Sequence, residues 1–121
     1  MRKEKILIVD DDPDIRDVLQ ITLSENYEVI SAQNGKEGLV MVKTSNPDLV
    51  ITDYMMPSMT GAELIGRLRE QRPVLNILIL TAHEAILNAE HPTWWVQEPH
   101  LGKPVKIEEL RAAVTKLIGP P

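Results

Sequence analysis

Short aliphatic runs alternate along this chain with segments in which apolar residues recur every three or four positions. The runs are typical of buried parallel strands and the recurring positions of amphipathic helices, so the alternation predicts repeated strand and helix units. The expected strands are residues 6–9, 27–32, 48–52, 76–82 and 100–103. Together they predict an α/β domain with a doubly wound, five-stranded parallel sheet.

Capping residues and prolines place the expected helices. Asp12 and Pro13 suit the N-cap and first turn of a helix after the first strand. A second helix is expected to begin at residues 34–35 and to end before residue 45. A third is expected over residues 61–72, and a last one from residue 107 to the GPP sequence at the end of the chain. The apolar stripes of the first and last helices are Ile15, Val18, Leu19, Thr22 and Leu23, and Ile107, Leu110, Val114 and Leu117.

Residues 83–99 lack such a pattern. Pro92 and Pro99 interrupt a helix there, so we expect an irregular fourth helix region. Trp94 and Trp95 lie between these prolines. The plainer interpretation is that one tryptophan packs on the core and the other lies on the surface. The alternatives are an exposed anchor for a partner protein and a segment that is mobile or exchanged between chains.

The composition is that of a globular protein, since 43% of the 121 residues are hydrophobic and 26% are charged. No apolar run approaches bilayer length and no signal peptide precedes the first strand, so we expect a cytoplasmic protein without membrane contact. The chain has no cysteine, which excludes disulfides and thiolate chemistry. A net charge of −5 without a basic cluster argues against direct nucleic-acid binding.

Polar residues stand at the carboxyl ends of four expected strands. Asp10 and Asp11 follow the first strand and Asp53 the third, Thr81 lies in the fourth near its end, and Lys103 ends the fifth. In a doubly wound fold these ends meet at one edge of the sheet. Carboxylates without His or Cys form a hard oxygen site that suits Mg²⁺. A divalent cation would offset the repulsion between the adjacent aspartates.

Magnesium beside an aspartate, a lysine and a hydroxyl also suits phosphoryl transfer. The positive charges neutralise phosphoryl oxygens while a carboxylate attacks phosphorus and forms an aspartyl phosphate. Acidic residues at a helix start are, taken alone, more often solvated caps. Their occurrence together with Asp53, Thr81 and Lys103 favours the phosphoryl-transfer interpretation.

Four segments carry a resemblance to a known family: ILIVDDDP, PDLVITDYMMPSMTG, ILILTA and GKP. In order and spacing they are similar to the receiver domains of two-component response regulators, over nearly the whole chain. The resemblance implies one receiver domain over residues 1–121, with a (βα)5 sheet of flavodoxin-like strand order.

The resemblance also implies roles for the acidic residues. Asp53 would be the phosphoacceptor, and Lys103 would pair with the phosphoryl group. Mg²⁺ would be held by Asp11, by Asp53 and by the backbone carbonyl of Met55. Asp10 would act on the ion largely through bound water.

A conformational switch is implied as well. The Thr81 hydroxyl would move to hydrogen-bond a phosphoryl oxygen, and the side chain three positions before Lys103 would change rotamer in response. Similar proteins carry an aromatic residue at that position. This chain carries His100 there, which departs from the usual aromatic gate.

The first hypothesis is therefore a phosphorylation-dependent switch that is not a turnover enzyme. Its donor would be a sensor histidine kinase or a phosphotransfer protein, and its target a downstream effector protein or a fused output domain. A homodimer is left open. The alternative is a phosphate-independent interaction domain of the same fold that uses the face with Trp94 and Trp95.

Three other site types fit less well. An Mg²⁺-dependent phosphohydrolase would need a carboxylate two residues after its nucleophile, where this chain has Met55. A zinc site would have to be built from His83, His91 and His100 without any cysteine. Nucleotide binding is disfavoured because no Gly-rich phosphate loop follows the first strand.

Overall fold

The computed structural model describes residues 3–54, 59, 61–81, 99–103 and 105–119. Five parallel strands form one sheet in the order β2-β1-β3-β4-β5. The strands are β1 (Lys5–Val9), β2 (Glu28–Ala32), β3 (Leu49–Asp53), β4 (Asn76–Thr81) and β5 (His100–Gly102). The helices are α1 (Pro13–Ser24), α2 (Gly35–Ser45), α3 (Gly61–Gln71) and α5 (Ile107–Ile118). The expected doubly wound, flavodoxin-like fold is confirmed.

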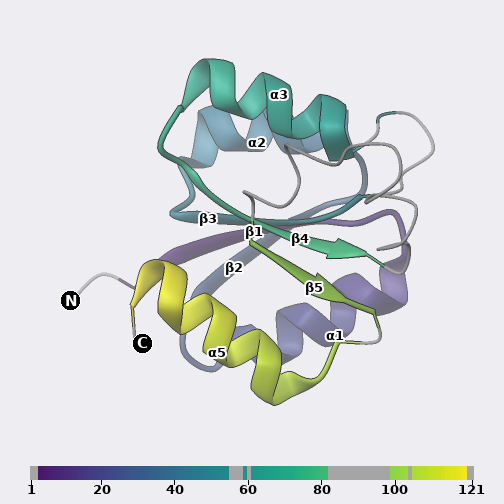
Figure 1. Ribbon diagram of the computed structural model, residues 1–121, viewed down its shortest axis with the longest axis vertical. Helices are drawn as coiled ribbons and strands as arrows, with labels where there is room; N and C mark the ends of the chain where they lie inside the picture. Colours follow the sequence, from purple (N-terminus) through teal and green to yellow (C-terminus); the bar gives the residue numbers. More distant parts are fainter. Residues whose placement is uncertain (1–2, 55–58, 60, 82–98, 104, 120–121) are drawn as a thin grey trace.

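Helices cover both faces of the sheet (Figure 1). α2 and α3 lie on one face, and α1 and α5 lie on the other. Strand side chains alternate between the two faces, so each face has its own buried cluster. Leu7 and Val9 of β1 pack with α2 and α3, whereas Ile6 and Ile8 pack with α1 and α5. Burial on both faces explains why the inner strands are almost wholly aliphatic.

The strand order reverses between β1 and β3. From β1 the chain moves outward to β2 and then returns to place β3 on the other side of β1. The carboxyl ends of β1 and β3 therefore flank the crevice in which doubly wound folds bind ligands. This topology places the candidate site.

Helix α1 begins as expected but presents a narrower apolar stripe. The Asp12 side chain accepts a hydrogen bond from the Asp14 amide at 2.9 Å, and Pro13 follows in the first turn. Leu19 and Leu23 of the apolar stripe are buried, whereas Val18 is 58% exposed. Buried positions four residues apart form a straight line along the helix, and Val18 lies beside that line.

Helices α3 and α5 also lie where the sequence pattern predicts them. Leu64, Ile65 and Leu68 of α3 are buried on the inward face of the helix expected there. In α5 Leu110 and Val114 of the apolar stripe are buried, whereas Ile107 lies at the first turn and is 50% exposed. α5 ends at Gly119, whose φ of +87° suits glycine and whose carbonyl accepts a hydrogen bond from the Tyr27 hydroxyl at 3.2 Å.

None of the helices in the described ranges is both long and apolar enough to cross a bilayer. Residues 82–98, and with them the expected irregular helix, Trp94 and Trp95, lie outside the described residues. So do Met55, His83 and His91.

Candidate functional site

Three carboxylates converge at the carboxyl edge of the sheet. Val9 of β1 is in register with Thr52 of β3, so Asp10 and Asp53 occupy the next position on two adjacent strands. One oxygen from each of Asp10, Asp11 and Asp53 lies within 4.8 Å of the others. Asp10 and Asp53 are buried, with 2% and 9% exposure, and Asp11 is exposed. Among the residues that the structure describes, the cluster is therefore most exposed to solvent at Asp11.

Lys103 closes the buried side of this cluster. Its Nζ lies 3.3 Å from Oδ2 of Asp10 and 3.3 Å from Oδ2 of Asp53. Its backbone amide donates to the Thr81 carbonyl at 2.8 Å, which ties the residue after β5 to the end of β4. One ammonium among three carboxylates leaves an excess of negative charge at the edge, which a cation would offset.

Asp10 is held in place at several atoms. Its Oδ1 accepts a hydrogen bond from the Asp12 amide at 2.9 Å, and its Oδ2 faces Lys103. Its amide donates to the Ala32 carbonyl at 3.2 Å. Both carboxylate oxygens of Asp10 thus already have protein partners. Asp12 belongs to the helix instead, because its side chain caps α1.

The donor set determines which ion this cluster suits. The carboxylates supply oxygen atoms alone, and no histidine in the described ranges joins them. Hard oxygen ligands around a partly open site are the preference of Mg²⁺, which retains several waters. The residues present therefore fit magnesium. The proposed Met55 ligand lies outside the described residues.

Thr81 and His100 occupy the other face of the sheet end. Thr81 is 1% exposed, and His100 is half-buried in register with Ile79. Side chains two residues apart on a strand share a face, so Thr81, Ile79 and His100 lie on the same face. Leu101 packs into the opposite cluster, with α1 and α5. The two expected switch residues are thus diagonal neighbours on adjacent strands.

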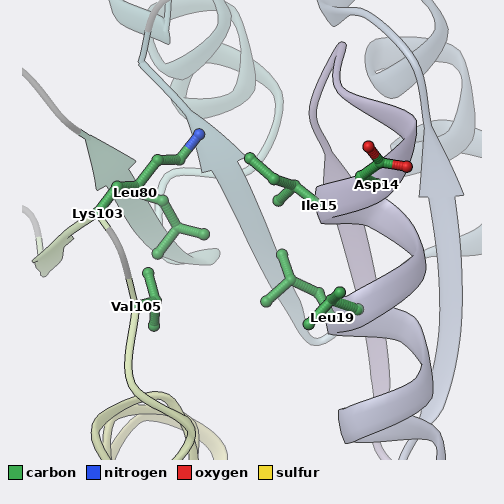
Figure 2. Close-up of a pocket in the computed structure, with 7 residues that line it drawn as sticks. Asp14, Ile15, Leu19, Leu80, Lys103 and Val105 are labelled. Carbon is green, nitrogen blue, oxygen red and sulfur yellow. The ribbon is translucent and has the colours of Figure 1, made fainter.

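A largely apolar groove adjoins the acidic cluster (Figure 2). It has a volume of about 520 Å³ and lies between α1 and the segment that links β5 to α5. Leu80, Lys103 and Val105 line one side, and Ile15 and Leu19 of α1 line the other. Val18 also lines the groove, and its side chain is partly exposed there. The aliphatic stem of Lys103 connects the groove to the carboxylates.

Arg16 also belongs to this site, although the sequence pattern did not predict it. Nη1 of Arg16 donates a hydrogen bond to the backbone carbonyl of Asp10 at 2.7 Å. The helix dipole disfavours a cation in the first turn of a helix. The presence of an arginine there was the feature of the sequence that could have drawn attention to this contact. An arginine placed there against the dipole indicates that its side chain has a specific partner.

Comparisons with known proteins agree with this geometry. The sequence pattern of the family described as "Response regulator receiver domain" matches residues 6–115. Sporulation initiation phosphotransferase F of Bacillus subtilis (strain 168) is 34% identical over 98% of this chain and 96% of its own length. Response regulator MprA of Mycolicibacterium vanbaalenii is 37% identical over 94% of this chain. This chain spans about half the length of that relative, covering 50% of it.

Solved structures are similar over the whole fold. The response regulator TrrA of Thermotoga maritima, in complex with Mg²⁺ and BeF, has a TM-score of 0.84 and 35% identity over 95% of this chain and 99% of its own. The chemotaxis response regulator CheY4 of Vibrio cholerae has a TM-score of 0.85 and 31% identity, covering 96% of this chain and 99% of its own. With its strand order, its acidic edge and these matches in agreement, the chain belongs to the response regulator receiver domain family of two-component systems.

Proposed function

We propose that the chain acts as the phosphoacceptor switch of a two-component phosphorelay, with Asp53 as the acceptor and residues 1–121 as one receiver domain. The observation that carries this proposal is the bridge from Lys103 to both Asp10 and Asp53, at 3.3 Å each, beside the exposed Asp11. A nucleophilic carboxylate, a fixed ammonium and a cation site are the groups that phosphoryl transfer to a side chain requires.

The transfer step follows from these positions. An oxygen of Asp53 attacks the phosphorus of a phosphohistidine, an oxygen–phosphorus bond forms, and the nitrogen–phosphorus bond breaks. The bonding electron pair stays on the imidazole nitrogen. Lys103, already near Asp53, pairs with the incoming phosphoryl oxygens. Because Asp53 is only 9% exposed, few waters compete with the donor.

Magnesium would be held by Asp11 and Asp53, together with the carbonyl of Met55. When bound, Mg²⁺ supplies positive charge that neutralises the phosphoryl oxygens and orients them for transfer. Asp10 is proposed to act through bound water. The support is that its Oδ1 and Oδ2 already engage the Asp12 amide and Lys103.

The switch is proposed to run from Thr81 to His100. A phosphoryl oxygen on Asp53 gives the Thr81 hydroxyl a new acceptor and draws it toward the acidic edge. The space that Thr81 leaves lies on the face that His100 shares. The imidazole then changes rotamer and alters the outer surface near β5.

The proposed phosphodonor is a sensor histidine kinase or a phosphotransfer protein. The groove beside Lys103 gives such a protein an apolar surface next to the acceptor. The signal would pass to a downstream effector protein or to a fused output domain, and a homodimer is one way to transmit it. The domain would promote its own phosphorylation and dephosphorylation without being a turnover enzyme.

Acetyl phosphate tests the proposal because it replaces the unidentified donor. Intact mass is measured after incubation with and without Mg²⁺, for the wild type, Asp53→Asn and the control Asp17→Asn, which changes an exposed aspartate of α1. We expect a phosphoryl adduct that requires Mg²⁺, that Asp53→Asn loses and that Asp17→Asn retains. Absence of any adduct would favour the phosphate-independent interaction domain.

A further inference from the structure

Every polar atom of Asp10 is engaged, and one of its partners is a residue without an assigned role. The amide, Oδ1 and Oδ2 are engaged by Ala32, by the Asp12 amide and by Lys103. The remaining atom, the carbonyl oxygen, accepts from Nη1 of Arg16 at 2.7 Å. This is the shortest of the four contacts, and its donor carries a positive charge.

The carbonyl that Arg16 binds belongs to the peptide unit between Asp10 and Asp11. The orientation of this peptide plane determines where the next side chain, that of Asp11, projects. Within the described part of the chain the Asp11 carboxylate is exposed and receives no hydrogen bond of its own. Its position therefore depends on the backbone that precedes it.

Arg16 is itself well anchored. Its amide donates to the Asp12 carbonyl at 3.1 Å in the first turn of α1, and its side chain is half-buried. The guanidinium thus spans from a rigid helix back to the end of β1. A side chain anchored in this way can hold a loop peptide in one orientation without contacting the bound ion.

We propose that Arg16 is a positioning residue for the cation site: through the Asp10 carbonyl it holds the Asp11 carboxylate toward Asp10 and Asp53. The inference rests on the proposed function, because it takes Asp11 and Asp53 as the groups that hold the cation. It adds a residue that neither binds the ion nor contacts the phosphoryl group.

A purely electrostatic role for Arg16 makes the opposite prediction. If the guanidinium acted only as a positive charge near the carboxylates, its removal would strengthen the binding of a divalent cation. If it positions Asp11, its removal weakens binding. The sign of the change in affinity therefore separates the two roles.

The test measures Mn²⁺ affinity from the electron paramagnetic resonance signal of the free ion. Arg16→Met removes the donor, and Arg16→Lys keeps the charge but not the planar guanidinium. Arg111→Met is the matched control, because Arg111 donates to the Thr22 carbonyl at 3.4 Å from α5, outside the acidic cluster. Circular dichroism checks that each variant is folded.

We expect Arg16→Met to raise the Kd for Mn²⁺ by about tenfold, the usual effect of losing a group that orients a metal ligand. Arg16→Lys should also bind more weakly than the wild type, and Arg111→Met should match the wild type. Unchanged or tighter binding by Arg16→Met overturns the inference. If that variant does not fold, wild-type affinity in Arg16→Lys overturns it. A wild type that binds no Mn²⁺ overturns the proposed cation site itself.

Discussion

Nζ of Lys103 lies 3.3 Å from Oδ2 of Asp53, and the two groups come from the ends of strands that are not neighbours in the sheet. The same ammonium faces Asp10 at 3.3 Å. Without a phosphoryl group Lys103 offsets the charge of two buried carboxylates. In the proposed function, a phosphoryl group on Asp53 would give Lys103 a new partner with more negative charge. The same contact would then stabilise the unphosphorylated fold and assist the transfer.

Removal of Lys103 should destabilise the protein in the absence of metal. Lys103→Met leaves two buried carboxylates without their cation, which is expected to cost about 3 kcal/mol of the free energy of unfolding. Urea unfolding in EDTA measures this loss. Lys43→Met, which changes an exposed lysine of α2, should remain within about 0.5 kcal/mol of the wild type. Equal stability of Lys103→Met and the wild type would contradict the assigned contact.

Magnesium should stabilise the fold through Asp11. At a concentration one hundred times its Kd, a bound ion adds about 2.7 kcal/mol to the free energy of unfolding. Asp11→Asn removes a ligand and should lose this gain. In EDTA the same variant should unfold at a slightly higher urea concentration than the wild type, because one repelling charge is absent. Thermal unfolding with and without Mg²⁺ checks the first effect, and an undiminished Mg²⁺ gain in Asp11→Asn would exclude Asp11 as a ligand.

Asp12 should affect the helix and not the cation. Asp12→Ala removes the cap on the Asp14 amide and is expected to cost about 1 kcal/mol of stability. Asp12→Ser retains a capping oxygen and should lie close to the wild type. Both variants should keep the Kd for Mg²⁺ within about twofold, well short of the tenfold effect of losing a group that orients a metal ligand. Weak Mg²⁺ binding by the well-folded Asp12→Ser would show that Asp12 is a ligand.

The agreement between sequence and structure is closest where local pattern decides the outcome. Asp12 caps α1 as expected, and Asn34 caps α2 where a helix was expected to begin, because a cap is determined by a few adjacent residues. The edge of the sheet was also predictable, since Asp10 directly follows β1 and Asp53 ends β3, and these residues have to meet when β1 pairs with β3.

The misses concern contacts that depend on how elements pack. Val18 and Ile107 match the helical period, yet both are exposed because they lie beside the buried line or at a helix start. The contact from Arg16 to Asp10 spans six residues and depends on the angle between β1 and α1. Spacing alone does not determine that angle.

Thr81 should couple phosphorylation to His100. Thr81→Val keeps the shape of the side chain but removes the hydroxyl, so we expect an adduct on Asp53 without a response at His100. Carbon–proton NMR of the imidazoles reports this directly, since the chain has only 3 histidines. Thr52→Val is the matched control, because Thr52 is also buried and its hydroxyl donates to the Asp53 carbonyl at 2.9 Å. A normal His100 response in Thr81→Val would contradict the switch.

The chemical location of the adduct shows whether Asp53 accepts the phosphoryl group. Borohydride reduces an aspartyl phosphate to homoserine, so the modified position can be read by peptide sequencing in the mass spectrometer. After incubation with acetyl phosphate and Mg²⁺, we predict homoserine at position 53. Homoserine at position 10 or 11, or at none of the aspartates, would contradict Asp53 as the acceptor.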